Sequence, residues 1–324
     1  MTAEAVKPEA FESLLARMLT AGLFTVVAAG SWDVWWHGAI GRDTFWEPPH
    51  IVLQAGVAVV VLTAAYDWFR VRATRWAWLA LAALLAPVSA PFDELWHRAF
   101  GIESLRSPLI VWSPPHLALV GGLLAALVLV LTVLHRDRDQ MARSTFIGMA
   151  AAAILTLLLF LAQPLEPLGP YHLAGFAGTA AQALLIAFVL RATKDLLPGA
   201  GSTLLTTVFF VTLGSIAAEP RQVAPGVDIP LHGHPPGWLW VFAYLLPAAI
   251  VDIVGPRWPR AIIGGAIGLL YAGTLFAFTG PFLESSFRYS TADALVAIVS
   301  GVIGGAVGGS LSTTAGTGFG AQTS

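Results

Sequence analysis

Residues 117–134 read LALVGGLLAALVLVLTVL, a run of small and aliphatic side chains that contains no charge. About 20 such residues in a helix cross the roughly 30 Å hydrocarbon core of a membrane. Comparable runs recur throughout the 324 residues, which are 56% hydrophobic and 11% charged, whereas soluble domains carry about 25% charged residues. The sequence therefore predicts an all-α fold, a polytopic integral membrane helix bundle, and excludes a secreted soluble domain or a nucleic-acid-binding protein.

Ten candidate spans can be read between the polar segments of the chain. They are residues 13–30, 51–66, 76–92, 117–134, 145–162, 173–190, 203–218, 238–254, 261–279 and 291–310. Glycines lower the hydrophobicity of the last run, which leaves nine spans as an alternative. We expect a single membrane domain over residues 1–324, with a first helix-loop-helix repeat at 13–66, a second, parallel copy at 76–134, the remaining spans at 145–310 and a disordered tail at 311–324.

The distribution of basic residues predicts the orientation of the bundle. The loops after even-numbered spans hold Arg70, Arg72, Arg75, Arg136, Arg138, Arg143, Arg191, Lys194, Arg257 and Arg260, whereas the odd-numbered loops hold Arg42, Arg98, Arg106, Arg221 and Arg288. Because cytoplasmic loops carry the excess of Lys and Arg, we expect a cytoplasmic N-terminus in the plasma (inner) membrane. Every histidine except His135 then falls on the acidic periplasmic or extracellular face, where we expect the chemistry to take place.

Two segments of this outer face repeat each other. In the first, Asp33 and His37 precede the run WEPPH at residues 46–50; in the second, Asp93 and His97 precede the run WSPPH at 112–116. Residues four apart share one face of a helix, and a Pro-Pro pair suits a helix start, so each copy is expected to gather one carboxylate and two imidazoles. The predicted metal ligands are Asp33, His37, His50, Asp93, His97 and His116. The alternative is an interfacial belt of Trp and His residues.

The first copy resembles the copper-site segment of the C subunit of particulate methane and ammonia monooxygenases over about twenty residues. That family has an Asp, three residues, a His, twelve residues and a second His, with Arg-Asp-Thr and a Pro-x-His ending inside the spacer. The resemblance implies that Asp33, His37 and His50 bind copper near the outer face and that partner subunits take part. The second copy departs from the family, because Asp93 stands where the family has Asn and eighteen residues separate His97 from His116.

The ligands alone leave the identity of the metal open. Two imidazoles and one carboxylate with open positions hold non-haem iron, and the same set with Glu holds catalytic zinc. The chain has no cysteine, and Met1, Met18, Met141 and Met149 lie away from the outer loops, so no thiolate or thioether site is predicted. Copper ranks first only because of the resemblance, with iron or zinc as alternatives.

Other outer-face residues are candidates for supporting roles. His232 and His234 flank a glycine in a long loop and form a less favoured metal site. Glu94, Glu166 and His172 are candidates to orient metal-bound imidazoles through hydrogen bonds. Solvated loop histidines and polar interfacial turns are the alternatives for these positions.

These observations favour a membrane copper protein that acts as a monooxygenase-like component, activating dioxygen to oxidise a small apolar substrate. One alternative is a non-catalytic metal-handling protein for copper uptake, storage or delivery; another is a structural protein whose repeats are belt elements. The spans lack the midplane carboxylates that mark ion pathways, which disfavours transport through the bundle. We expect the lipid bilayer and an electron donor or partner subunits as partners. A homo-oligomer is compatible with the sequence, and nucleic acid is not expected.

Overall fold

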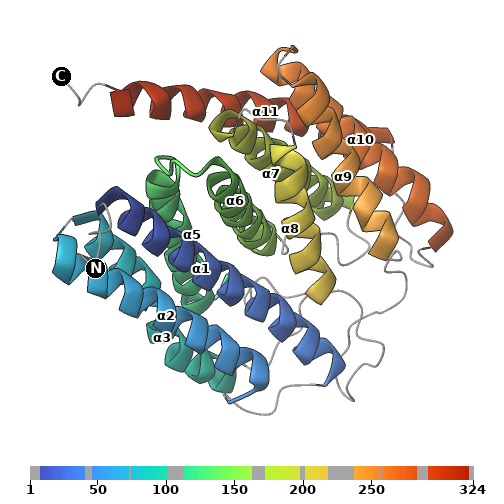
Figure 1. Ribbon diagram of the computed structural model, residues 1–324. Coiled ribbons are helices and arrows are strands. Elements are labelled where there is room, and N and C mark those ends of the chain that lie inside the picture. Colours follow the sequence, from blue (N-terminus) through green and yellow to red (C-terminus); the bar gives the residue numbers. More distant parts are fainter. Residues whose placement is uncertain are drawn as a thin grey trace. The chain divides into compact units, whose positions relative to one another are not determined.

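The computed structural model describes residues 8–40, 46–72, 74–100, 112–162, 172–197, 201–217, 237–255, 257–282 and 291–320. These residues form ten helices and no strand, as Figure 1 shows. In chain order the helices are α1 (Pro8–Ala39), α2 (Pro48–Val71), α3 (Thr74–Phe100), α5 (Pro114–Leu134), α6 (Gln140–Ala162), α7 (His172–Leu196), α8 (Ser202–Ala217), α9 (Gly237–Val254), α10 (Arg260–Phe282) and α11 (Thr291–Gly320). Each predicted span overlaps one helix, and the all-α prediction is confirmed.

Six of the described helices are long and apolar enough to cross a membrane. They contain the segments Phe11–Trp36, Pro48–Arg70, Thr74–Phe100, Pro114–Leu134, Gln140–Ala162 and Thr291–Gly309. The apolar stretches Ser202–Ile216, Tyr244–Val254 and Arg260–Gly273 are shorter. α11 continues to Gly320, past the predicted end of the last span and into the segment predicted to be a disordered tail. The long apolar helices are consistent with an integral membrane protein.

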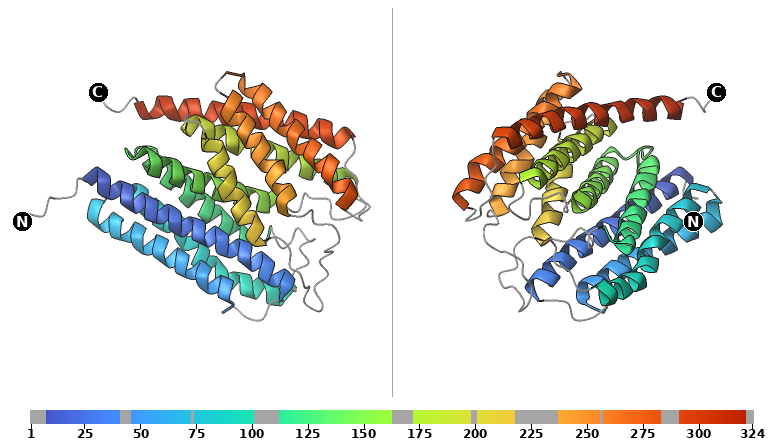
Figure 2. Two further views of the ribbon diagram at one scale, coloured as in Figure 1. Left: turned by 45° about the vertical axis from the view of Figure 1, so that its right-hand side comes forward. Right: turned by 180° about the vertical axis from the view of Figure 1, so that it is seen from behind.

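The chain divides into two compact units, and the division falls within α6. In the first unit, α1 packs on α2, α2 on α3, α3 on α5 and α5 on α1, which closes a ring of helices. The two views of Figure 2 show these helices side by side. In the second unit, α7 packs on α10 and α11, and α8 packs on α9.

Two glycines allow the helices of the first unit to approach each other closely. A Cβ atom at Gly56 in α2 would come within 2.8 Å of a Val26 methyl group in α1. A Cβ atom at Gly122 in α5 would come within 2.5 Å of the Ala82 carbonyl oxygen in α3. Small residues at helix crossings permit the close van der Waals packing that holds helices together in lipid. The α1–α2 pair and the α3–α5 pair therefore both pack around a glycine.

The starts of α2 and α5 place two predicted ligands in equivalent positions. Both helices begin with a Pro-Pro pair, where a missing N–H costs no helical hydrogen bond. His50 and His116 follow directly, so each imidazole lies in the first turn of its helix. Ser113 caps α5, because its Oγ accepts a 3.3 Å hydrogen bond from the backbone N–H of His116. Glu47 occupies the same position before α2 and makes no capping hydrogen bond with its side chain.

Ion pairs fix the end of the first unit that lies away from these helix starts. Arg17 of α1 donates to Asp137 from Nε at 2.7 Å and from Nη2 at 2.8 Å. Asp137 is 2% exposed, and the hydrogen bond from Arg17 holds the pKa of its carboxyl below the usual value. Arg75 of α3 donates to Glu12 of α1 at 2.7 Å. These contacts link α1 to α3 and to the residues that follow α5.

The second unit has its own buried ion pair and its own close helix crossing. Lys194 of α7 donates to Asp252 of α9 at 2.9 Å, and Asp252 also accepts the backbone N–H of Leu204 at 2.9 Å, which caps α8. A Cβ atom at Gly268 in α10 would collide with the carbonyl group of Ala297 in α11. Every predicted ligand whose side chain is described belongs to the first unit instead.

Candidate metal centre

The first candidate site lies where the end of α1 meets the start of α2. Asp33 lies in the last two turns of α1 and His50 in the first turn of α2. His50 Nε2 is 3.1 Å from Asp33 Oδ1, and the two side chains are 18% and 20% exposed. Two ligands of one metal ion at about 2.0–2.2 Å each are separated by about 2.8–3.5 Å. The distance between the two atoms therefore suits two ligands of one ion as well as a shared proton.

Glu47, for which the sequence predicts no metal-binding role, joins this pair. Asp33, Glu47 and His50 each offer one ligand atom, and these atoms all lie within 4.8 Å of one another. Glu47 is 3% exposed, so its carboxylate is turned away from solvent. The available signal was its position directly before a Pro-Pro helix start, where Ser, Thr, Asp or Asn is the usual capping residue. The buried carboxylate of Glu47 therefore lies beside Asp33 and His50 and does not cap α2.

The second candidate site repeats the carboxylate–imidazole contact on the other helix pair. Asp93 lies near the end of α3, and its Oδ1 is 3.4 Å from Nε2 of His116 in the first turn of α5. Both side chains are partly exposed, at 23% and 17%. Ser113 takes the position that Glu47 has in the first site, and its hydroxyl caps α5 instead. The second site therefore has one carboxylate fewer among the described residues.

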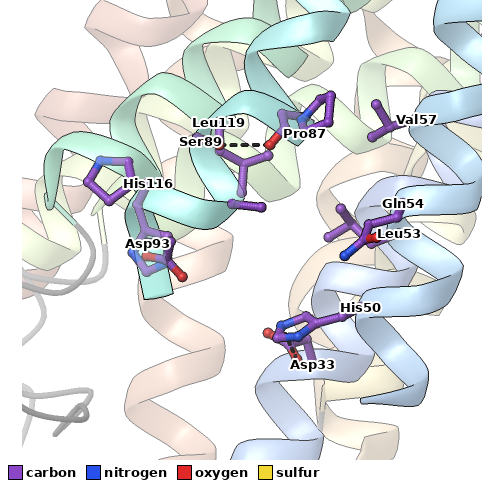
Figure 3. A pocket seen from close by; sticks show the side chains of 13 residues that line it. Asp33, His50, Leu53, Gln54, Val57, Pro87, Ser89, Asp93, His116 and Leu119 are labelled. Carbon is purple, nitrogen blue, oxygen red and sulfur yellow. Dashed lines mark hydrogen bonds and ion pairs between the residues drawn. The ribbon is translucent and has the colours of Figure 1, made fainter. Parts of the chain in front are cut away.

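Both carboxylate–imidazole pairs line one cavity, which we call the acid–His cavity. Its volume is about 90 Å³. It is lined by Asp33, His50, Leu53, Gln54, Val57, Ala86, Pro87, Ser89, Ala90, Asp93, Pro115, His116 and Leu119. Figure 3 shows the Asp33–His50 pair on one side of this cavity and the Asp93–His116 pair on the other. The helix ring of the first unit thus places both Asp–His pairs around one cavity.

An apolar groove adjoins the acid–His cavity. It is lined by Leu85, Val88, Ser89, Phe92, Leu95, Trp96, Ala99, Phe100, Pro114, Pro115 and Ala118 and has a volume of about 530 Å³. Ser89 and Pro115 line both the groove and the cavity. Phe92 and Leu95 are 59% exposed, so the groove is open on the outside of the α3–α5 pair. The groove and the cavity are therefore neighbouring spaces on α3 and α5.

The structure leaves several predicted residues untested. His37 and His97 lie in α1 and α3, one turn after Asp33 and Asp93, but their side chains are outside the described residues. The same holds for the side chain of His172, and Glu166, His232 and His234 fall entirely outside the described ranges. Glu94, predicted to support an imidazole, accepts a 2.9 Å hydrogen bond from Arg98 one turn further along α3. The roles of these residues stay predictions.

Two carboxylates and one imidazole around one point suit a hard or borderline divalent cation. Carboxylate oxygens and imidazole nitrogens hold zinc, iron and copper, and softer ions prefer the sulfur ligands that this cavity lacks. Partial burial strengthens the attraction between the carboxylates and a cation, because less water screens the charges. None of the known protein-family models matches the chain, and neither a curated protein nor a solved structure matches it.

Proposed function

We propose that this chain is a membrane metalloprotein that binds a divalent transition-metal ion in the acid–His cavity. The observation that carries the proposal is the convergence of Asp33, Glu47 and His50, whose ligand atoms lie within 4.8 Å of one another. Three such ligands leave coordination positions open for water or a substrate, as in catalytic sites and unlike closed structural ones. His37 is the proposed fourth protein ligand, on the basis of its position one turn after Asp33 in α1.

Copper is the proposed ion, and dioxygen-dependent oxidation of a small apolar substrate is the proposed reaction. The resemblance of residues 33–50 to a copper-site segment supports the ion. The apolar groove supports the substrate class, because Ser89 and Pro115 line both the groove and the acid–His cavity. Bound copper would supply the one-electron chemistry that dioxygen activation requires. The protein would hold the ion through Asp33, Glu47 and His50 and present the substrate through the groove.

The two helix pairs of the first unit are, in this proposal, copies of one helix-loop-helix element. Supporting this, each pair has an Asp–His contact at its helix junction, a Pro-Pro start to its second helix and a glycine at its crossing. The proposal also includes about ten spans in the plasma membrane, metal sites on the outer face and an electron donor or partner subunit. Because each helix pair has its own Asp–His contact, the chain could bind two metal ions.

Metal handling without catalysis is the second candidate function, as copper uptake, storage or delivery. Glu47 favours it, because an additional buried carboxylate binds a divalent ion tightly without contributing redox chemistry. In this case the groove would hold lipid. Both functions require the metal site, but only the first includes turnover of a substrate. Metal binding is therefore tested first.

The test is the metal content of the full chain, purified in detergent micelles and loaded with Cu²⁺. We expect the wild type to retain copper after desalting and the His50→Ala variant to lose it, because one of the ligands is missing. His135→Ala is the matched control, since His135 is exposed at the other end of α5. Equal copper retention by the wild type and His50→Ala, or none in the wild type, would overturn the proposal.

A further inference from the structure

The acid–His cavity has two ends that differ in charge. One end is lined by Asp33 and His50, and the other by Asp93 and His116. Glu47 does not line the cavity itself, but it adds a carboxylate to the first end, because its ligand atom lies within 4.8 Å of those of Asp33 and His50. Among the described ligands, the first end carries two negative charges and the second carries one. The difference arises at a single position, the residue directly before the Pro-Pro pair.

The residue at that position, Ser113 before α5 and Glu47 before α2, has a different role in each helix pair. Ser113 is the N-cap of α5, and its hydroxyl oxygen accepts a 3.3 Å hydrogen bond from the backbone N–H of His116. Glu47 leaves α2 without a side-chain cap and is 3% exposed beside Asp33 and His50. Replacing a capping residue by one that does not cap typically costs about 1 kcal/mol of helix stability. At this position Glu47 provides a buried carboxylate beside Asp33 and His50 in place of a helix cap.

The cavity is large enough for two ions. A volume of about 10–15 Å³ accommodates one water molecule, whereas the acid–His cavity has about 90 Å³. Two cations with their remaining water ligands fit within this space. Two ions sharing one cavity repel each other, so the second is bound more weakly than the first unless its ligands compensate. Here the ligands at the second end carry less charge. Repulsion from the first ion and the smaller ligand charge therefore both weaken binding of the second ion.

We propose that the acid–His cavity binds two divalent cations in sequence, that the Asp33–Glu47–His50 end fills first, and that Glu47 sets this order. The proposal rests on the proposed function, because it requires metal binding in the cavity. The second ion enters at Asp93 and His116 only at higher metal concentration. A protein of this design holds one ion permanently and exchanges the other.

The test is a titration of the full chain in lipid nanodiscs with Co²⁺, whose visible spectrum reports its coordination, together with elemental analysis. We expect two Co²⁺ ions per wild-type chain, with dissociation constants that differ by about tenfold or more, the size of effect seen when groups around a metal are removed. In Glu47→Ser the first ion should bind about tenfold more weakly, so that the two steps merge. Ser is a preferred N-cap, and this variant is therefore expected to keep or raise the melting temperature.

The reciprocal variant Ser113→Glu provides the matched control. It adds a carboxylate to the second end, so the second ion should bind more tightly while the first is little changed. One Co²⁺ per wild-type chain would overturn the two-ion cavity while leaving the proposed function intact. Unchanged affinity for the first ion in Glu47→Ser would overturn the role of Glu47. No Co²⁺ or Cu²⁺ in the wild type would overturn both proposals together.

Discussion

Asp33 and His50 come from two helices, yet their Oδ1 and Nε2 atoms lie 3.1 Å apart. Both atoms can act as ligands of one ion bound between them. About four fifths of each side chain is buried, so the charge on Asp33 is less screened than it would be at a surface. We therefore expect the affinity for a metal ion to depend on the charge of the Asp33 side chain more than on its shape.

An Asp33→Asn variant tests this dependence on charge. The amide has nearly the same size as the carboxylate, so we expect the melting temperature to change little. Affinity for the first metal ion should fall about tenfold or more, because a charged ligand has become a neutral one. Isothermal titration with Cu²⁺ or Co²⁺ measures both dissociation constants. Asp93→Asn is the control and should weaken mainly the second ion; equal loss of the first ion in both variants would contradict the assignment of the two ends.

Glu47 shows which site residues can be predicted from sequence and which cannot. Asp33, His50, Asp93 and His116 were predicted because helix periodicity and the Pro-Pro starts fix where they lie on their own helices. The structure describes one carboxylate–imidazole contact in each helix pair, Asp33–His50 and Asp93–His116. The side chain of Glu47 has a local alternative, which is to cap α2. Which task it takes depends on the packing of α1 against α2, and no local pattern of the sequence encodes that packing.

Asp137 carries a second residue-level prediction, at the end of the first unit away from the cavity. Its folded pKa is depressed by the hydrogen bond from Arg17, so the pair stabilises the fold fully above the unfolded carboxyl pKa, which is about 3.9. This contribution is lost as the pH falls below that value and through the folded pKa. Asp137→Asn should lower the free energy of unfolding by about 1.5–3 kcal/mol near neutral pH. Its thermal midpoint should also fall less steeply than that of the wild type below about pH 4.

Asp139→Asn is the control for this measurement. Asp139 lies 3.5 Å from Arg17, but its side chain is 52% exposed, and Asn caps a helix as well as Asp does. Circular dichroism of both variants in detergent micelles gives the midpoints. A pH profile for Asp137→Asn that parallels the wild type would contradict the assigned role of the ion pair.

At the scale of helices, the α1–α2 pair and the α3–α5 pair both pack around a glycine, but their first helices, α1 and α3, differ in proline content. α3 contains Pro87 and Pro91, and a proline inside a helix removes a backbone hydrogen bond to the residue four positions earlier. Pro87, Ser89 and Ala90 line the acid–His cavity, so the cavity lies against the part of α3 that contains these prolines. α1 has no proline within the corresponding turns.

The glycine at the α3–α5 crossing gives a prediction with a neighbouring control. In Gly122→Ala the new Cβ would meet the Ala82 carbonyl oxygen at 2.5 Å and Leu85 Cβ at 2.8 Å, so the helices must separate. Overpacking of this kind costs about 1–3 kcal/mol. Gly121 has nothing within 4 Å of the same atom, and Gly121→Ala should be neutral or stabilising because Ala favours helix. Thermal unfolding followed by tryptophan fluorescence compares the two; equal melting temperatures would contradict the close packing.

The helices themselves could be predicted because hydropathy and proline placement are local signals. The predicted starts at 51 and 117 lie within the first turn of α2 and α5, and both observed helices begin at their Pro-Pro pair. The shared cavity could not be predicted in this way. It depends on the order of α1, α2, α3 and α5 around the ring, and apolar spans in lipid can pack in several orders with similar burial.

At the scale of the whole molecule, the described candidate chemistry belongs to one of the two units. The acid–His cavity and the apolar groove are lined entirely by residues before Leu157, which belong to the first unit. The groove is open on the outside of the α3–α5 pair, where a membrane would place hydrocarbon chains. Catalysis and metal handling therefore make different demands on the groove, since only catalysis requires it to admit a substrate.

The last prediction separates these two functions by filling the groove. Ala118 of α5 lines the groove, and Ala118→Trp should occupy much of its volume without touching a described metal ligand. If the chain oxidises an apolar substrate, copper-loaded protein in nanodiscs with a reductant should convert a small alkane or alkene, and the variant should lose most of this turnover, about tenfold or more. Copper content should stay at the wild-type value, because the ligands are unchanged.

Ala125→Trp is the matched control, since Ala125 lies two turns further along α5, is exposed, and does not line the groove. It should keep full turnover, because a tryptophan there faces the surroundings of the helix. Equal losses in the two variants would point to a general effect of bulk on α5 and would contradict substrate entry through the groove. Copper retention without turnover in the wild type, combined with copper release to an acceptor, would instead favour metal handling. The groove would then be a lipid contact, and Ala118→Trp would leave copper release unchanged.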